Sequence, residues 1–256
     1  MRILITNDDG IQSEGIQLLE EIARQFSDDV WVVAPNREQS GKGHALSLTE
    51  PIRFRKVGEK HFAVDGTPTD CVMIAIHQIM KDQKPDLVLS GINRGCNLAE
   101  DMTYSGTISA AMEGVLCGVP SIALSQEIDR NDLSDIFAVS RDHAASVIKN
   151  VLDTLMSHKT CLLNINFPPH QEVKGVMATK QGYRSDGEIF IDERKDLRGG
   201  RYYWLGFKRA YGDPEIGSDL AAIRDGYISI TPLQLDLTEY KMLSNLAGQV
   251  NKEFKS

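Results

Sequence analysis

ILITNDDG, residues 3–10, joins a short apolar run to two adjacent carboxylates and a glycine. The apolar half, residues 3–6, predicts a buried β-strand, and the polar half, residues 7–10, ends it. Asp8 and Asp9 admit two interpretations. Asn-Asp-Asp-Gly is a good turn sequence that could cap a following helix. Two neighbouring carboxylates also repel each other unless a cation lies between them or one takes a proton, so a cation site is the second interpretation.

Apolar strands and amphipathic helices alternate downstream of this segment, which is the pattern of βα units. The run DLVLS (86–90) is apolar almost throughout, and such runs predict strands covered on both faces. We therefore expect an α/β protein with a doubly wound, mostly parallel, Rossmann-like sheet. The expected strands are 2–6, 30–34, 86–90, 121–125 and 161–167, with the short β-runs ALSL, IRFR and HFAV between residues 45 and 64, and the expected helices are 15–26, 69–80, 105–118 and 136–156.

The pattern changes after about residue 170. Alternating aromatic and polar residues around Asp186-Gly187 and Gly199-Gly200 predict β-hairpins, which would offer exposed edges to a partner. A short helix, a strand over 227–231 and a terminal helix over 239–256 are expected to follow. We expect one domain over 1–256, made of a core with the active site (about 1–170), a hairpin extension for oligomerisation (about 171–215), and a return strand with a helical C-terminal tail (about 216–256).

The composition excludes some classes of function. The chain has 256 residues and a net charge of −8, so it lacks the basic surface that general binding of duplex nucleic acid requires. The N-terminus has no apolar core of a signal peptide, and no segment approaches the length of a spanning helix, so we expect a cytoplasmic protein without a membrane partner. The four cysteines are far apart and indicate neither disulfides nor a zinc knuckle; Cys96, in a glycine-rich loop, is expected to be the accessible one.

Polar, glycine-rich loops follow several of the expected strands. In an open parallel sheet, ligands bind beyond the carboxyl ends of the strands. The loop after 30–34 contains Ser40, and the loop after 86–90 contains Asn93 and Asn97. Hydroxyl and amide oxygens can ligate a hard cation, and amide NH₂ groups can donate to phosphate. Each loop taken alone could instead be an ordinary surface turn.

The helix expected at 105–118 begins with Ser105-Gly106-Thr107. Ser105 or Thr107 could simply cap the helix. A helix N-terminus also presents free N–H groups and a positive dipole end, and Gly106 would let a phosphate approach closely. Together with the two aspartates and the polar loops, this pattern favours metal-assisted hydrolysis of a phosphate ester.

Six motifs, in this order, also resemble a known family: ILITNDDGI, VVAPNREQSGKGHALSLT, GTPTDCV, DLVLSGINRGCN, YSGTISAAMEG and GYISITPLQLDLT. They resemble SurE, the stationary-phase survival family of metal-dependent 5′-nucleotidases, from residue 1 to about residue 240. The resemblance implies hydrolysis of nucleoside 5′-monophosphates, with 3′-nucleotides and short polyphosphate as further possible substrates. It also implies one Mg²⁺ or Mn²⁺ ion per subunit, and homodimers or homotetramers formed through the C-terminal hairpin and tail.

The resemblance also assigns roles to the residues above. It implies that Asp8 and Asp9 are catalytic, that the metal ligands are Asp8, Asp9, Ser40 and Asn93, and that the phosphate lies near Asn97, Ser105, Gly106 and Thr107. One mechanism has Asp8 or Asp9 orient or deprotonate a water, and the other has Asp8 attack phosphorus. The alternative function is a nucleotide-binding or sensing module without turnover, which could use the same fold and cation.

Overall fold

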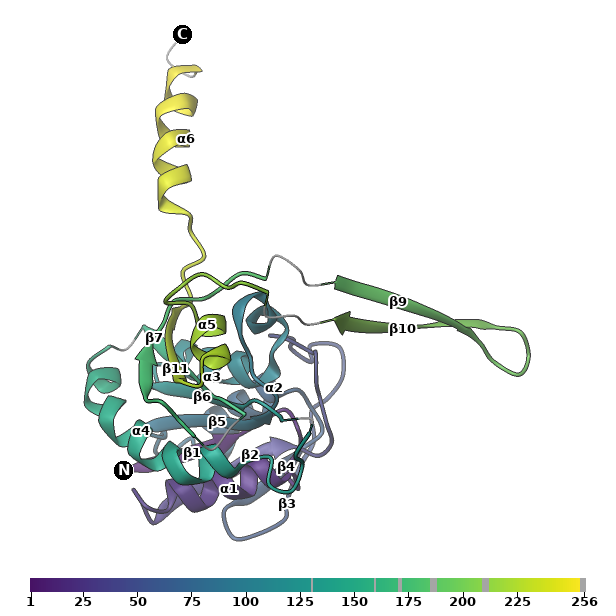
Figure 1. Ribbon diagram of the computed structural model, residues 1–256. Helices are drawn as coiled ribbons and strands as arrows, with labels where there is room; N and C mark the ends of the chain where they lie inside the picture. Colours follow the sequence, from purple (N-terminus) through teal and green to yellow (C-terminus); the bar gives the residue numbers. More distant parts are fainter. Residues whose placement is uncertain (130, 159, 170–171, 185–187, 209–211, 254–256) are drawn as a thin grey trace.

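The structure, a computed structural model, describes residues 1–256 except 130, 159, 170–171, 185–187, 209–211 and 254–256 (Figure 1). Nine strands form the central sheet: β1 Arg2–Thr6, β2 Asp29–Pro35, β3 Phe54–Lys56, β4 His61–Val64, β5 Leu87–Arg94, β6 Ser121–Gln126, β7 Cys161–Phe167, β8 Val176–Ala178 and β11 Ile228–Gln234. Their order is β3-β4-β2-β1-β5-β6-β7-β11-β8. Only the β3–β4 and β7–β11 pairs of this sheet are antiparallel in the described residues, so the expected mostly parallel sheet is confirmed.

Helices cover both faces of the sheet, and one hairpin lies outside it (Figure 1). The helices are α1 Glu14–Ala23, α2 Pro68–Ile74, the π-helix η1 Ala75–Ile79, the 3₁₀-helix η2 Ala99–Tyr104, α3 Gly106–Leu116, α4 Ala138–Ser157, α5 Asp219–Arg224 and α6 Tyr240–Glu253, and the hairpin strands are β9 Glu188–Lys195 and β10 Arg201–Lys208. None of the helices described is both long and apolar enough to cross a membrane.

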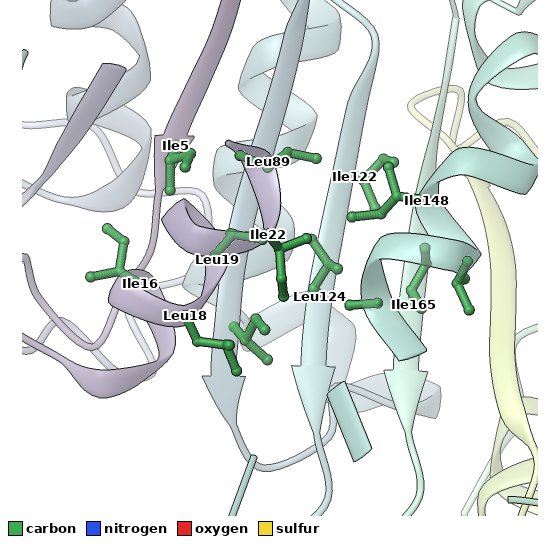
Figure 2. Close-up of a cluster of buried hydrophobic side chains, with 14 of the residues drawn as sticks. Ile5, Ile16, Leu18, Leu19, Ile22, Leu89, Ile122, Leu124, Ile148 and Ile165 are labelled. Atoms are coloured by element: carbon green, nitrogen blue, oxygen red, sulfur yellow. The ribbon is translucent and has the colours of Figure 1, made fainter. Parts of the chain in front are cut away.

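The larger part of the core lies between the sheet and helices α1 and α4. Leu19 and Ile22 of α1 recur at helical spacing and pack in one cluster with Ile148 of α4 and with Ile5 and Leu89 of the central strands (Figure 2). Full burial of each such side chain contributes about 1.5–3 kcal/mol of transfer free energy. This packing holds β1 and β5 rigidly, which matters because both strands lead to the polar loops.

The other face of the same strands packs against α2 and α3. Leu4 and Val88 alternate with their neighbours and point to this side, where they join Val72 of α2. Ile108 of α3 packs with Ala123 of β6 in a further cluster. Two covered faces explain why ILI and LVL are apolar at successive positions.

The chain reverses its direction of travel across the sheet at β1. It runs outward from β1 to β2 and β4, and then returns to place β5 on the other side of β1. Such a switch point leaves a crevice at the carboxyl ends of the two strands, which is where open α/β sheets bind ligands. Asp8 and Asp9 follow β1 at this point, and Asn93 lies at the end of β5.

A hairpin and a terminal helix project from the body of the molecule (Figure 1). β9 and β10 pair with each other, from Glu188 opposite Lys208 to Lys195 opposite Arg201. They form a separate two-stranded sheet, and α6 follows the last strand of the main sheet. The expected hairpin extension and helical tail are confirmed as one hairpin and one helix. The turn expected at Asp186-Gly187 includes residues outside the described part of the chain.

The helix expected over 69–80 is present, but its second half is wider: α2 is α-helical to Ile74 and continues as the π-helix η1. Two other local expectations were wrong. ALSL (45–48) forms no strand, since the Ser47 N–H and hydroxyl bond to the Asp70 carboxylate instead of a neighbouring strand. Cys96 is buried rather than accessible, because its loop folds back over the end of β7 and its thiol donates to the Phe167 carbonyl.

Candidate active site

The turn after β1 is made by Asn7 and Gly10. The Asn7 amide donates to the Gly10 carbonyl (3.0 Å) and to the Ser13 hydroxyl (2.8 Å), and its oxygen accepts from the Gly10 N–H (3.2 Å). Gly10 has φ +98°, a left-handed conformation that glycine adopts without strain. The turn interpretation therefore holds for Asn7 and Gly10, and it leaves the carboxylates of Asp8 and Asp9 available for another role.

Asp8 meets the beginning of α3. The Thr107 hydroxyl donates to Asp8 Oδ1 over 2.6 Å in the buried interior. A Cβ at Gly106 would lie 2.8 Å from Asp8 Cβ and 3.0 Å from Asp8 Oδ2, so only glycine allows this approach. Ser105 is the N-cap, since its Oγ accepts from the Ile108 N–H (3.1 Å). The two hydroxyls of this turn thus have different roles, one in the helix cap and one on Asp8.

The surroundings of both aspartates favour the protonated forms. Burial raises the pKa of Asp8, and hydrogen bonds from Thr107 oppose the rise. Burial and then the charge of Asp8 raise the pKa of Asp9 from 3.8 to about 6, although the Arg94 N–H donates to Asp9 Oδ2 (3.3 Å). A divalent cation between the two groups would reverse this effect, because it stabilises both charged forms.

The loop after β2 brings Ser40 to the same edge. The Gln39 N–H donates to the Asp8 carbonyl (2.8 Å), which ties this loop to the turn after β1. The exposed Ser40 hydroxyl donates to Glu38 Oε1 (2.8 Å), and the Glu38 charge also raises the pKa of Asp8 and Asp9. Glu38 is thus a third carboxylate at the site that sequence reasoning missed. The signal for Glu38 was its place in the same loop as Ser40, shortly after the end of β2 at Pro35.

The loop after β5 supplies Asn93 and Asn97 in different ways. Asn93 is half-buried, and its amide donates to the Gly95 carbonyl (2.7 Å). The next N–H along the chain, that of Arg94, contacts Asp9, so Asn93 lies near the carboxylates. The Asn97 amide is buried and donates to the Ser125 hydroxyl (2.8 Å), so this NH₂ group has an internal partner. A role for Asn97 at the phosphate stays a prediction.

Sequence reasoning also missed the groups that fix Asn97. The Asn97 N–H donates to the Asn166 side-chain oxygen (2.9 Å). The Asn97 carbonyl accepts from the amides of Asn164 (2.8 Å) and Asn166 (3.2 Å). Both asparagines stand in the strand CLLNINF at alternate positions, which puts them on one face of β7. Polar residues at alternate positions of a buried strand were the available signal.

The donor set fits a hard divalent cation. In the part of the chain described, no group of three or more His, Cys, Asp or Glu side chains could hold a metal ion. The ligand set predicted from the sequence is of a different kind, because it combines two acidic side chains with a hydroxyl and an amide. All its donor atoms are oxygens, as Mg²⁺ and Mn²⁺ prefer. The groups that lower the pKa of the buried Asp8 are neutral hydrogen-bond donors. A bound cation would add a positive charge beside this carboxylate.

The fold and this edge of the sheet define a doubly wound α/β protein with a candidate ligand site at its switch point. The family described as "Survival protein SurE" matches residues 3–188. A protein of Erythrobacter litoralis named 5′-nucleotidase SurE is 49% identical over 246 residues, which are 95% of this chain and 97% of that one. One of Rhodopseudomonas palustris with the same name is 51% identical over 255 residues, which are 97% of this chain and 99% of that one.

A solved structure extends the likeness to the fold. The SurE protein from Aquifex aeolicus superposes with a TM-score of 0.80 at 41% sequence identity, covering 96% of this chain and 98% of that one. The matched regions include the turn after β1, both later loops and the beginning of α3. The chain belongs to the SurE family.

Proposed function

We propose that the protein is a metal-dependent 5′-nucleotidase, which hydrolyses nucleoside 5′-monophosphates to nucleosides and phosphate. Relatives at 49% and 51% identity over nearly the whole chain carry the name 5′-nucleotidase. The observation that carries the proposal is the contact between Asp8 and the start of α3. It supports a cation and a phosphate on adjacent groups, which is the arrangement that metal-assisted phosphomonoester hydrolysis requires.

In this proposal one Mg²⁺ or Mn²⁺ ion per subunit is held by Asp8, Asp9, Ser40 and Asn93. Such an ion supplies positive charge to the phosphoryl oxygens and lowers the pKa of a bound water. Thr107 holds Asp8 Oδ1, and Oδ2 lies on the side of Gly106. The Thr107 hydroxyl therefore fixes the direction in which Asp8 presents its second oxygen.

The phosphate would lie against the first turn of α3. Helix N-termini leave their first N–H groups without intrahelical partners, and the dipole there favours an anion. Ser105 and Thr107 complete this turn, and because Asp8 and Pro68 fill the space beside Gly106, the phosphate would meet the N–H groups of the turn. Asn97 stays a predicted neighbour of the phosphate. These groups would stabilise the charge on the equatorial oxygens in the transition state.

Asp9 is the better candidate for the group that orients or deprotonates the attacking water. It is less buried than Asp8, so it is the more accessible of the two carboxylates to a water at the site. Asp8 Oδ1 is engaged by Thr107, which disfavours attack by Asp8 on phosphorus. Rapid-quench experiments with labelled AMP test this choice: a hydroxylamine-labile phosphoenzyme would reject the water route.

The activity is tested by phosphate release from AMP and GMP with Mn²⁺. We expect turnover by the wild type, none after EDTA treatment, and a loss of at least about 100-fold in Asp9→Ala. Asp28→Ala is the matched control, because Asp28 is exposed and directly precedes β2, at the opposite edge of the sheet. Wild-type release no greater than that of Asp9→Ala would favour a binding module. A panel with 3′-nucleotides and short polyphosphate defines the substrate range.

We also infer a homodimer or homotetramer assembled through β9–β10 and α6. Trp204 and Leu205 of β10 are 60% and 70% exposed, and Leu243 and Leu246 of α6 are about half exposed. Isolated hairpins and short helices are marginal in water, so apolar surface on both elements favours burial against another copy. This assigns oligomerisation to about 171–215 and the tail, and catalysis to the core over about 1–170.

A further inference from the structure

Ala99, the first residue of η2, has a left-handed backbone with φ +51°. It is fully buried, and it is the only non-glycine residue with positive φ in the part of the chain described. The Cβ of an L residue disfavours this conformation, so surrounding groups must hold it. The position therefore raises the question of which groups do so.

Asp219 contacts Ala99 from the opposite end of the chain. Its Oδ2 accepts the Ala99 N–H over 2.9 Å, and its Oδ1 accepts the N–H groups of Gly182 (2.8 Å) and Leu220 (2.7 Å). The carboxylate is fully buried. Gln181 holds the other side of the same residue, since its amide donates to the Ala99 carbonyl (3.1 Å). Both backbone polar groups of Ala99 are thus held by residues from the C-terminal third of the chain.

Packing reinforces these hydrogen bonds. Leu98 and Ala99 form a small apolar cluster with Leu220 and Ile223 of α5, separate from the main core. A Cβ at Gly182 would lie 2.7 Å from Asp219 Oδ1, so the Gly182 backbone approaches the carboxylate as closely as glycine permits. The Asp219 side chain is therefore enclosed by these hydrogen bonds and apolar contacts.

Ala99 is joined to the candidate phosphate site by one short helix. η2 ends at Tyr104, and the next residue, Ser105, caps α3. The Tyr104 carbonyl accepts the Gly43 N–H (3.2 Å), and Arg184 donates to Asp101 (2.9 Å), so η2 is held along its length. A change of backbone direction at Ala99 would move η2 and the turn that follows it.

We propose that Asp219 is a positioning residue for the phosphate-binding turn, and that it acts by holding Ala99 in the left-handed conformation. The inference rests on the proposed function in assigning phosphate to Ser105–Thr107. The proposed metal ligands Asp8, Asp9, Ser40 and Asn93 all precede Ala99 in the chain. Asn97 is held separately by Asn164 and Asn166. Loss of Asp219 should therefore weaken phosphate binding most, and metal binding only through the Thr107 hydroxyl that holds Asp8.

The first test is Asp219→Asn in the full-length protein. The change keeps the side-chain shape but replaces one acceptor oxygen with an NH₂ donor. We expect kcat with AMP and Mn²⁺ to fall about 10- to 100-fold, in line with the cost of a small misplacement. Affinity for inorganic phosphate should fall in parallel, and affinity for Mn²⁺ should fall by a smaller factor, because Thr107 links the turn to only one of the proposed metal ligands, Asp8. Asp225→Asn is the matched control, because Asp225 is an exposed carboxylate at the other end of α5 and should keep wild-type values.

The second test is rescue by Ala99→Gly. Glycine adopts positive φ without strain, so it needs less support from Asp219. We expect Ala99→Gly alone to stay within about threefold of wild type, and the double variant D219N/A99G to recover most of the loss in kcat and phosphate affinity. A merely structural role for Asp219 predicts no such rescue. Wild-type kcat in D219N, or an equal loss in D219N and D219N/A99G, would overturn the inference.

Two further measurements keep the result decisive. If D219N fails to fold, as judged by circular dichroism and thermal unfolding, Gln181→Glu removes the donor on the other side of Ala99. A loss that A99G rescues in that background supports the inference, and no loss overturns it. If the wild type hydrolyses no nucleotide, the proposed function fails, but titration of the Mn²⁺-loaded proteins with inorganic phosphate still compares wild type, D219N and D219N/A99G.

Discussion

The hydrogen bond from Thr107 to Asp8 joins the two halves of the candidate active site. It spans 99 positions of the chain and lies in the buried interior. A buried carboxylate that loses a donor keeps its desolvation penalty without compensation. The bond therefore supports both the stability of the protein and the direction of Asp8.

Replacing Thr107 with valine removes the donor and keeps the shape. We expect a loss of about 1–3 kcal/mol in the free energy of unfolding of the metal-free protein. Weaker Mn²⁺ binding should accompany it, because Asp8 loses its fixed orientation. Thr107→Ser retains the hydroxyl and should stay close to wild type in both respects. Urea unfolding and Mn²⁺ titration measure the difference, and equal stability of the valine and serine variants would contradict it.

Asp9 predicts an unusual pH dependence of the metal-free protein. The folded protein holds a proton on Asp9 up to a pKa of about 6, whereas the unfolded chain releases it near 3.8. Between these values the folded state binds more protons, so its stability falls as pH rises. Asp9→Asn removes this penalty and should stabilise the metal-free protein by about 1–2 kcal/mol at pH 7, after allowance for solvent screening.

Thermal unfolding in EDTA at pH 4.5 and pH 7 tests this prediction. The gain from Asp9→Asn should be largest at pH 7 and about a third as large at pH 4.5, where the folded state holds the proton and the unfolded chain has released most of its own. The same substitution should weaken Mn²⁺ binding, because it removes a charged ligand. A gain of equal size at both pH values would show that Asp9 ionises normally in the folded protein.

At the level of whole elements, local signals were predictable from the sequence. Thr67 and Asp70 form a capping box at the start of α2, and Ser105 caps α3, as their side-chain chemistry indicates. Gly118 follows α3 with φ +80°, the conformation expected of glycine after a helix. These features depend on neighbours within one turn, so the sequence alone contains the necessary information.

Contacts between distant segments were not predictable in the same way. Asp219 and Ala99 are 120 positions apart, and Arg184 and Asp101 are 83 apart. No periodicity or motif links such residues, because only the folded sheet brings them together. The same reason explains the failure at ALSL: Ser47 bonds to Asp70, 23 positions away, and that bond replaces a strand pairing.

Shortening the hairpin tests its proposed role in assembly. Phe190 and Gly206 are register partners, so residues 191–205 can be removed and the two joined through Asn-Gly, which favours a two-residue hairpin turn. We expect the variant to fold, because β9 and β10 pair only with each other. Its oligomeric mass should fall, as measured by light scattering after size-exclusion chromatography. An unchanged mass would locate the interface elsewhere.

For the molecule as a whole, the sheet is what assembles the site. The loops after β1, β2 and β5 and the start of α3 meet at one edge because the strands are parallel and the chain reverses at β1. The site therefore depends on global folding, and a ligand that binds there should stabilise the entire fold by mass action. The proposed cation is the ligand to test.

Metal removal should lower the melting temperature. At a Mn²⁺ concentration about 100 times the dissociation constant, the expected stabilisation is about 2.7 kcal/mol. The effect should be larger at pH 7.5 than at pH 5.5, since protons compete for Asp9 below its pKa of about 6. Differential scanning calorimetry with and without EDTA measures both, and the D9A variant should show little response. A wild-type response independent of pH would place the cation away from Asp9.

The parallel direction of the central strands also guides where the protein can be modified. Arg2 begins β1, and its N–H donates to Asp86 (2.6 Å) just before β5, so the chain starts at the amino edge of the sheet. The polar loops lie at the carboxyl edge, a full strand length away. An affinity tag, fluorophore or surface anchor fused before Met1 would leave that edge open and keep clear of the hairpin and α6. Immobilised in this way, the protein should present its candidate active site to solution in a single orientation.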